Sequence, residues 1–388
     1  MKTLKSILKW IVIILVVLNL LILISGRTYL YKGIANTYLK GRKGPSITEY
    51  KIFSNREVNV GTPQPWAVAV NYNKATIPAN DLADMEKYKT IAYVIVKNDS
   101  ICYEQYWDGF GRNSVTNSFS MAKTFVSILV GIAIDGGKIK SVDEPVGDFL
   151  SQFKDGENAQ LTIKDLLTMS SGINFDENYV SPFAYPAQAY YGTDLQKLTY
   201  GYKVTETPGK AFKYLSGNSS LLSFIVEKST GMPLSVYASV KLWQPMGAEN
   251  PAYWSLDHPN GVEKAYCCFN SNARDFARFG ELYLQNGNWN GKQLVSEAYV
   301  KASVAPANIL DDFGNPNKKY GYNWWLLNYK GHAVFYARGI LGQYILAIPD
   351  EKMVVVRLGK TRAKGQTDGH PDDVYEYLDA ALSMYGTN

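Results

Sequence analysis

Hydrophobic and polar positions change their spacing several times along the chain, and each change predicts a different element. Residues 91–106 contain two apolar runs separated by turn-forming side chains at 97–100, a pattern that predicts a β-hairpin. From Met121 onward, apolar residues occupy almost every side of a helical pattern that stops at Gly136 and Gly137. Because such a helix has no polar face, we expect it to be buried on most sides.

The remaining pattern predicts helices in the middle of the chain and strands near its end. Between about 140 and 290 we expect short helices and long loops, with helical candidates at 161–170, 221–228 and 272–285. Four later segments predict an antiparallel meander, followed by an amphipathic helix after Pro371: 322–329, 333–337, 343–348 and 353–358. The predicted fold class is α+β. It has one antiparallel sheet of about five strands from both chain ends, flanked by helices, with a mainly helical part inserted between them.

The N-terminus has the pattern of a targeting or anchoring segment. Lys2, Lys5 and Lys9 precede an apolar run at 10–24 that lacks a good small-residue cleavage site. We therefore favour an uncleaved signal-anchor over a cleaved signal peptide within residues 1–26. Residues 27–75 are then a juxtamembrane connector that becomes ordered where it meets the catalytic domain, and 76–388 form that domain. The simplest arrangement is a membrane-anchored protein whose catalytic domain is exported.

Charge and composition exclude several classes of function. The net charge is +5 and no long run of Lys or Arg occurs, so a nucleic-acid partner is not supported. Of the three cysteines, Cys267 and Cys268 are adjacent, and no C-x-x-C spacing exists for a metal or redox site. The three histidines lie far apart in the sequence. We predict no metal and no organic cofactor.

One Ser-x-x-Lys tetrad carries the candidate chemistry. The sequence holds three such tetrads, which begin at Ser6, Ser120 and Ser151, but only Ser120 stands where a glycine-containing loop enters the buried helix. There the unpaired N–H groups of a helix start favour a developing oxyanion. The i, i+3 spacing places Lys123 on the same face as Ser120. The residues alone leave open a simpler interpretation, in which Ser120 caps the helix and Lys123 extends to solvent.

Several ordered blocks resemble the serine β-lactamase/penicillin-binding superfamily. The likeness is closest to its class C β-lactamase-related branch, which includes esterases and 6-aminohexanoate-dimer hydrolases. The blocks cover roughly residues 90–385 and are found at 118–125, 131–146, 161–172, 208–214 and 273–280.

This resemblance implies a set of site residues. Tyr214 falls on the tyrosine of the family's Tyr-x-Asn motif and would share proton transfer with Lys123. The Asn position falls on Ser216, with Asn218 two residues further, so either residue could contact the substrate. The backbone N–H groups of Ser120 and Ile340 would form the oxyanion hole.

A second part of the likeness bears on the substrate. Gly339 would line the site on the strand edge that carries the family's Lys/His-x-Gly motif. This motif falls on Ala337-Arg338-Gly339, and Ala337 replaces the usual cation. The loss of that cation weakens a β-lactam assignment.

An aromatic loop lies between the tetrad and Tyr214. It includes Tyr185 and Tyr190, which we expect to wall the substrate pocket, although the loop could equally be a surface segment packed by its own rings. The leading hypothesis is a serine hydrolase that cleaves a small-molecule carboxylic ester or amide through an acyl-enzyme on Ser120. Two alternatives remain open: a β-lactamase or DD-peptidase, and a catalytically silent, membrane-tethered binding protein.

Overall fold

A seven-stranded sheet forms the centre of the protein, whose computed structural model describes residues 2–387. Its order is β10-β11-β12-β13-β3-β4-β2, and all neighbours are antiparallel except β2, which is parallel to β4. The strands are β2 (Ala67–Val68), β3 (Thr90–Lys97), β4 (Ser100–Tyr106), β10 (Trp325–Tyr329), β11 (His332–Gly339), β12 (Gln343–Ile348) and β13 (Met353–Gly359). The predicted hairpin and meander are confirmed, and β3 pairs with β13 so that both chain ends share one sheet.

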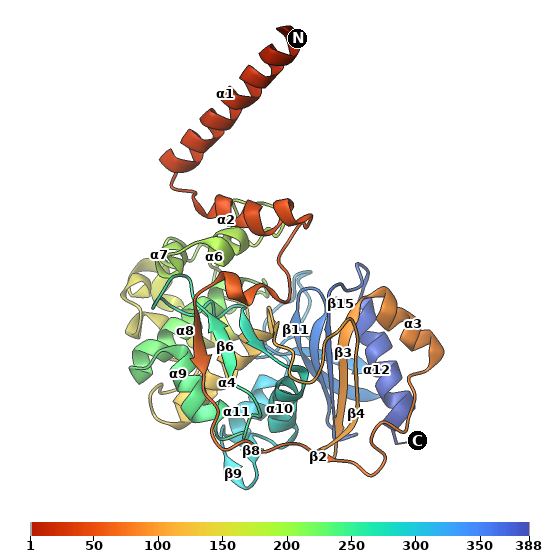
Figure 1. Ribbon diagram of the computed structural model, residues 1–388. Helices are drawn as coiled ribbons and strands as arrows, with labels where there is room; N and C mark the ends of the chain where they lie inside the picture. Colours follow the sequence, from red (N-terminus) through yellow and green to blue (C-terminus); the bar gives the residue numbers. More distant parts are fainter. Residues whose placement is uncertain (1, 388) are drawn as a thin grey trace.

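Helices cover both faces of this sheet (Figure 1). Helices α3 (Ala79–Lys87) and α12 (Asp372–Tyr385) lie on one face, and α4 (Met121–Asp135) and α10 (Ala273–Leu284) on the other. Successive residues of a strand point to opposite faces. In β12, Tyr344 therefore packs into the apolar cluster beneath α12, and Ile345 into the cluster beneath α4 and α10. The predicted α+β class is confirmed.

Helix α4 begins immediately after Ser120 and is the most deeply buried helix near the site. Its residues from Met121 to Ala133 are all buried, as the apolar pattern predicts. Gly136 ends the helix, and Gly137 follows with a φ of 65° that suits glycine. Because α4 is enclosed on all sides, its first turn holds a fixed position relative to the sheet.

The middle of the chain is mainly helical, as predicted. Candidates 161–170, 221–228 and 272–285 correspond to α5, α8 and α10. The remaining bounds are α5 (Ile163–Leu167), α6 (Tyr185–Tyr191), α7 (Leu195–Tyr200), α8 (Ser216–Thr230), α9 (Leu234–Ala238), a π-helical turn at Ser239–Trp243 and α11 (Glu297–Ser303). Short 3-10 helices occur at Tyr38–Lys40, Glu49–Ile52, Val146–Asp148, Ser151–Phe153 and Gly156–Gln160.

A second sheet, which the sequence pattern does not predict, joins the connector to the domain. It has the order β1-β6-β7-β5, formed by β1 (Asn55–Val58), β5 (Thr116–Asn117), β6 (Ala252–Ser255) and β7 (Phe269–Ser271). Phe53, Val58 and Trp66 of the connector are buried in the main core. The segment 27–75 is therefore ordered against the domain. Two small hairpins complete the strands, β8 (Asn288–Trp289) with β9 (Lys292–Gln293) and β14 (Gln366–Thr367) with β15 (His370–Pro371).

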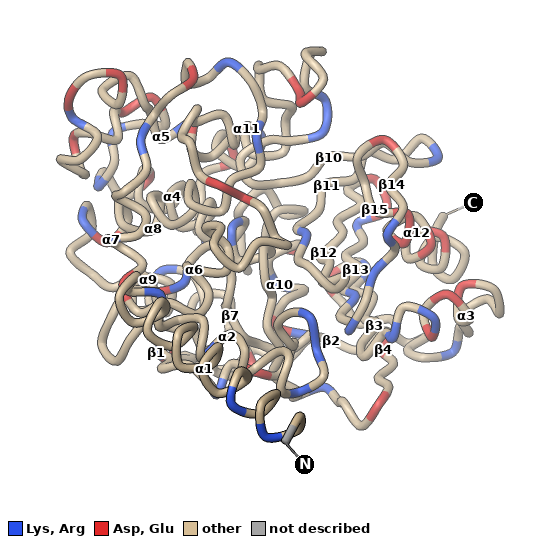
Figure 2. Tube along the Cα trace, turned by 90° about the horizontal axis from the view of Figure 1, so that it is seen from above, with Lys and Arg blue, Asp and Glu red and all other residues tan. Residues whose placement is uncertain are grey.

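Helix α1 (Lys2–Ile24) projects from the domain, and α2 (Tyr29–Asn36) lies across the domain surface at its base (Figure 1). Within residues 2–387, α1 is the helix long and apolar enough to cross a membrane: Thr3–Ile24 has a mean hydropathy of 3.0 and no buried residue. Its lysines lie near its N-terminal end, which points away from the domain (Figure 1), whereas the other charges of the chain are dispersed (Figure 2).

Candidate active site

A strained turn presents Ser120 at the start of α4. Phe119, the residue before it, has a φ of 46°, a left-handed value that costs a bulky side chain free energy. The Oδ1 atom of Asn117 compensates, since it accepts a hydrogen bond of 2.8 Å from Phe119 N–H, and Ser118 N–H donates to Phe269 O at 2.9 Å. The turn is thus fixed to β7, and Ser120 is half-buried at its tip.

The side chain of Lys123 lies beside Ser120, as the tetrad predicts. Its Nζ donates to Ser120 Oγ at 2.9 Å and to Tyr266 O at 2.8 Å, and the residue is 1% exposed. Both oxygens are uncharged. The amine is therefore held by polar groups in a buried site instead of extending to solvent, so the alternative of a solvent-exposed lysine is wrong.

Tyr214 reaches the same place from the segment that leads into α8. Lys123 Nζ lies 5.1 Å from the centroid of its ring. The ring is supported by Trp325, at 5.6 Å between centroids, and by Tyr320, at 6.3 Å. The structure thus brings Ser120, Lys123 and Tyr214 together, although they come from two segments almost a hundred residues apart.

The end of β11 passes directly over the serine turn. A Cβ atom added to Gly339 would lie 2.3 Å from Ser118 O, so no side chain fits between this strand and the turn. Ile340 follows and lines the same cavities as Ser120. Ala337 is fully buried in the core, whereas Arg338 lines the larger cavity, with its guanidinium 3.5 Å from the Trp325 ring centroid.

The two residues that could fill the Asn position have different surroundings. Ser216 lines the smaller cavity, and its N–H and Oγ both donate to the Glu177 carboxylate. Asn218 is fully buried, with Oδ1 accepting from Ser171 Oγ at 2.8 Å, and lines neither cavity. Within the described residues Ser216 is therefore the one of the pair that faces a cavity.

Of the two tyrosines predicted to wall the substrate pocket, Tyr190 lines a cavity and Tyr185 is buried in the core. Tyr190 lines the smaller cavity and donates to Glu49 at 3.0 Å. Tyr185 is fully buried between Thr199 and Ser220, each 3.0 Å from its hydroxyl, and lines neither cavity. Burial raises the pKa of both phenols. The exposed Tyr179, by contrast, lines both cavities.

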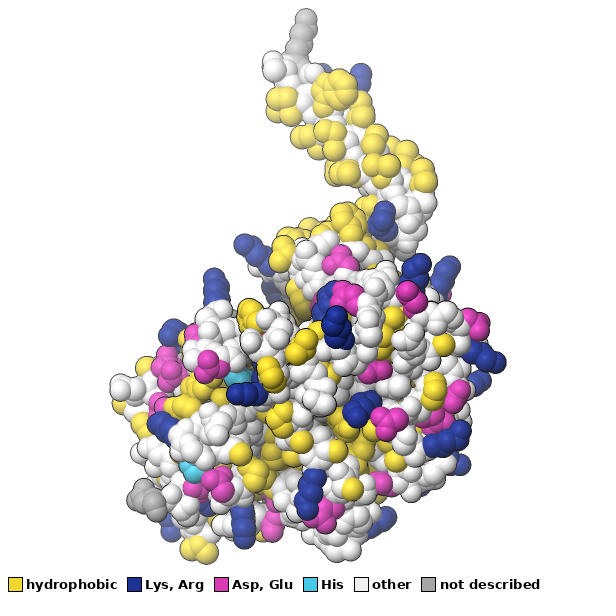
Figure 3. Space-filling model, turned by 180° about the vertical axis from the view of Figure 1, so that it is seen from behind, with side chains coloured by type: hydrophobic (Ala, Val, Ile, Leu, Met, Phe, Trp, Pro, Cys, Tyr) yellow, Lys and Arg dark blue, Asp and Glu magenta, His cyan; other side chains and the backbone are white. Residues whose placement is uncertain are grey.

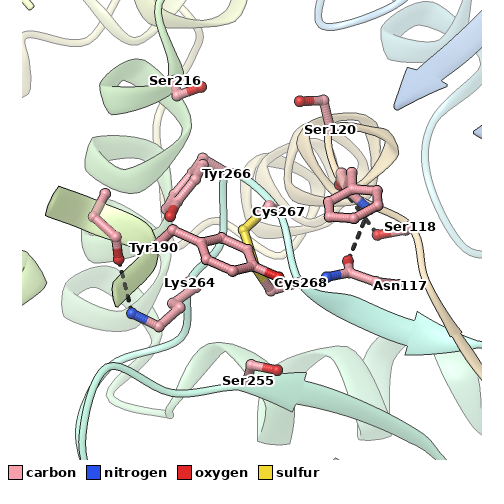
Figure 4. The surroundings of a disulfide bond; sticks show 12 residues. Asn117, Ser118, Ser120, Tyr190, Ser216, Ser255, Lys264, Tyr266, Cys267 and Cys268 are labelled. Carbon is pink, nitrogen blue, oxygen red and sulfur yellow. Dashed lines mark hydrogen bonds between the residues drawn. A yellow bond between two sulfur atoms is a disulfide. The ribbon is translucent and has the colours of Figure 1, made fainter. Parts of the chain in front are cut away.

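The segment 264–268 contributes contacts that the sequence reasoning missed. Besides the Tyr266 carbonyl, it contains a disulfide between the adjacent residues Cys267 and Cys268, and Cys267 lines the smaller cavity (Figure 4). Lys264 Nζ donates to Ala189 O at 2.8 Å at the end of α6, and burial lowers its pKa to about 7. The adjacency of Cys267 and Cys268 is the one feature of this segment that stands out in the sequence, and it does not indicate that the segment lies near Ser120.

Two cavities meet at Ser120. The larger has a volume of about 940 Å³ and is bounded by Tyr214, the end of β11 and several basic side chains. The smaller, about 180 Å³, lies between α2 and α6 and is lined mostly by apolar and aromatic residues. A carbonyl compound that enters either cavity can therefore reach the serine hydroxyl. Across residues 2–387, no group of three or more His, Cys, Asp or Glu side chains is arranged to hold a metal ion.

Comparison with known proteins agrees with this architecture. The model of the Beta-lactamase family matches residues 79–377. The 6-aminohexanoate-dimer hydrolase of Paenarthrobacter ureafaciens is 26% identical over 291 residues, which cover 71% of this chain and 73% of that protein. A Bacillus anthracis structure, proposed to be a 6-aminohexanoate-dimer hydrolase, superposes with a TM-score of 0.73 at 22% identity, covering 87% of this chain and 92% of that one.

The fold recurs in solved structures of other activities. A penicillin-binding protein homologue from Pyrococcus abyssi has a TM-score of 0.61 at 20% identity, over 79% of this chain and 76% of that one. A family VIII carboxylesterase has a TM-score of 0.62 at 16% identity, over 82% and 99%. Because the family model spans well over half of the sequence, the chain belongs to the beta-lactamase family, within the superfamily of serine β-lactamases and penicillin-binding proteins.

Proposed function

We propose that the protein is a serine hydrolase that cleaves a carboxylic ester or small amide through an acyl-enzyme on Ser120. The observation that carries this proposal is the 2.9 Å contact between Ser120 Oγ and Lys123 Nζ where the two cavities meet. Family membership supports hydrolase chemistry. A nucleophile within hydrogen-bond reach of a base is the arrangement that such chemistry needs.

In the proposed first step, Lys123 acts as the general base. It accepts the hydroxyl proton while Ser120 Oγ attacks the substrate carbonyl, and Tyr214 passes a proton to the leaving group. The Tyr266 carbonyl keeps the amine in place. The N–H groups of Ser120 and Ile340 hold the developing oxyanion, a contribution worth about 10²–10³-fold per donor in a typical acyl-transfer site. Water then attacks the acyl-enzyme and gives a proton to Tyr214, and Ser120 Oγ leaves with the proton held by Lys123, which releases the acid and restores the site.

The site favours an ester or small amide over a β-lactam. In related lactamases a cation at the position of Ala337 binds the substrate carboxylate, whereas Ala337 is buried in the core here. We therefore expect a labelled penicillin to acylate Ser120 slowly or not at all. Rapid labelling would instead favour the β-lactamase or DD-peptidase alternative.

The sequence offers a matched control for the nucleophile. Ser151 begins another Ser-x-x-Lys tetrad, but it is exposed and lines neither cavity. We expect Ser120→Ala to abolish hydrolysis of p-nitrophenyl acetate and labelling by a fluorophosphonate, located by mass spectrometry, while Ser151→Ala retains both. Full turnover by Ser120→Ala would refute the mechanism. A protein that neither turns over esters nor takes up the label would favour the silent binding protein.

The N-terminal helix supports a further part of the proposal, a membrane anchor with an exported catalytic domain. Thr3–Ile24 has the length and hydropathy of a membrane span, and none of its residues is buried. We expect the protein to remain in the membrane fraction after carbonate washing and to keep its N-terminal sequence. Release of the protein, or loss of the first 26 residues, would contradict the anchor.

A further inference from the structure

The smaller cavity has a mostly apolar lining. One wall is α2, through Leu30 and Ile34, and the opposite wall is α6, through Ala187 and Tyr191. The two helices pack closely, since a Cβ atom on Gly33 would lie 3.3 Å from the Tyr191 ring. Lys43 is the one charged side chain among the described residues of this lining. The cavity therefore suits a hydrocarbon chain better than a polar group.

The outer end of this cavity is rimmed by exposed apolar side chains. Ile34 is 42% exposed, Tyr38 68% and Val180 93%, and all three belong to the lining. Exposed apolar residues are ordinary when scattered, but a contiguous patch marks a contact surface. These three exposed residues line the same cavity, so the cavity opens to the surface where they lie.

That entrance lies at the base of α1. Helix α2 follows α1 after four residues, and Tyr31 of α2 donates to Asn19 of α1 at 2.9 Å. Hydrophobic side chains continue from α1 onto the adjoining domain surface (Figure 3). If α1 spans a bilayer, the apolar rim lies at the membrane surface. A chain leaving the membrane then reaches the cavity without crossing bulk water.

The larger cavity has the opposite character. It is lined by Arg42, Lys43, Arg338, Lys360 and Arg362, and no Asp or Glu of the described residues lines it. Arg42 pairs with Glu49 at 2.9 Å and Lys360 with Asp108 at 2.8 Å, whereas Lys43, Arg338 and Arg362 have no such partner in the described chain. Three uncompensated cations around one cavity favour an anionic ligand.

We infer that the substrate is an anionic amphiphile supplied by the bilayer. Its hydrocarbon acyl chain occupies the cavity between α2 and α6, its ester carbonyl lies at Ser120, and its anionic alcohol portion occupies the basic cavity. The carbonyl–oxygen bond breaks, the acyl group passes to Ser120 Oγ, the serine proton goes to Lys123, and the alcohol leaves with the proton that Tyr214 donates. Water then releases the fatty acid. This inference rests on the proposed function and names the substrate class for the same serine.

The first test measures chain length and charge together. The full-length protein, in phosphatidylcholine nanodiscs, is assayed with 4-acyloxybenzoates of two to eight carbons and with their uncharged methyl esters. Burial of each methylene favours binding by about fourfold, so kcat/KM is expected to rise steeply along the series. The carboxylate series is expected to exceed the methyl esters by two- to fivefold at low salt. Equal kcat/KM for acetyl and octanoyl esters would overturn the inference.

Matched variants assign the two effects to the two cavities. Ala187→Phe fills the apolar cavity and should reduce the octanoyl-to-acetyl ratio at least tenfold, whereas Ala302→Phe, on an exposed face of α11, should leave this ratio unchanged. Arg362→Gln should reduce the preference for the carboxylate esters, and the exposed Lys292→Gln should not. A ratio unaffected by Ala187→Phe would refute the assignment of the acyl chain to this cavity.

A last arm tests the source of the substrate. A dodecanoyl ester is placed either in the nanodiscs that hold the protein or in separate protein-free nanodiscs, and initial rates are compared. Faster hydrolysis in the shared discs supports supply from the bilayer, and equal rates refute it. Ser120→Ala distinguishes failure of the proposed function from failure of the proposed substrate class. If this variant still hydrolyses the acetyl ester, the proposed function fails, whereas its inactivity beside a flat chain-length profile leaves only the amphiphile refuted.

Discussion

Gly339 is the residue whose replacement tests the geometry of the site most directly. The Cβ atom of an alanine there would lie 2.3 Å from the backbone oxygen of Ser118, and neither atom can move away by rotation of a side chain. An ordinary carbon–oxygen contact is at least about 3.2 Å, so strand β11 and the serine turn must separate by about 1 Å. Because Ile340 N–H is one proposed oxyanion donor, this displacement moves it away from the carbonyl oxygen.

The size of the effect follows from that displacement. A misplacement of 1 Å costs about 10²-fold in rate, similar to the loss of one oxyanion donor. Overpacking should also lower the free energy of unfolding by about 1–3 kcal/mol. We therefore expect Gly339→Ala to fold, with kcat/KM for p-nitrophenyl acetate reduced about 10²-fold and the loss mainly in kcat, because the donor acts on the oxyanion of the transition state.

The assay pairs steady-state kinetics with urea unfolding of the same preparations. Gly111→Ala is the matched control, because a Cβ atom at Gly111 meets no atom within 4 Å and its φ is not in the left-handed region. We expect this control to remain within twofold of the unmodified protein. Activity of Gly339→Ala within twofold of the unmodified protein would refute the proposed role of the β11 edge.

Three further predictions concern proton transfer, a buried lysine and the loop that holds α8. Tyr214→Phe should lower kcat by about 10²–10⁴-fold, because it removes the phenol proposed to transfer a proton. Tyr266→Phe keeps the backbone carbonyl that binds the Lys123 amine and should change kcat less than tenfold. Equal losses in the two variants would contradict a specific role for the Tyr214 phenol. Lys264 has a pKa of about 7 in the folded protein, compared with about 10.4 in the unfolded chain. Between pH 7 and 9 the unfolded chain therefore binds more protons, so the free energy of unfolding should rise with pH, by at most about 1.4 kcal/mol per pH unit. Urea unfolding at the two pH values should show this rise, and Lys264→Met should remove it; an unchanged slope would be contrary evidence. Glu177→Gln should lower the unfolding free energy by about 1 kcal/mol, measured in the same way, because its carboxylate accepts from Ser216 at the start of α8, and an unaffected value would exclude that contribution.

The parts of the fold that could be predicted depend on local spacing. The i, i+3 relation of Ser120 and Lys123 is fixed by helix geometry, so their contact follows once the helix is recognised. Long apolar runs likewise identified β3, β12 and β13, because each is buried on both faces. The second sheet was missed because its strands have two to four residues, and β1 (Asn55–Val58) carries charged side chains without alternation.

Other features of the site depend on long-range contacts that do not require a particular residue type, so the sequence pattern does not predict them. The Tyr266 carbonyl that holds Lys123 is a backbone atom 143 positions away, which any residue type could supply. The spacing of Ser216 and Asn218 did not show which one faces a cavity, because that depends on how Glu177 meets the start of α8. The wall formed by α2 was equally hidden, since a short segment after an anchor is ordinarily a linker.

The pairing of strands from opposite ends of the chain has a consequence for biosynthesis. Ser120 is translated 220 residues before Ile340, an interval of about 10 to 45 s at ordinary elongation rates. Throughout that time β3 lacks its partner β13, and the serine turn lacks the β11 edge that lies over it. The nascent chain therefore cannot hydrolyse esters by the proposed mechanism. By the proposed mechanism, activity can therefore begin only after the final strands have added to the sheet.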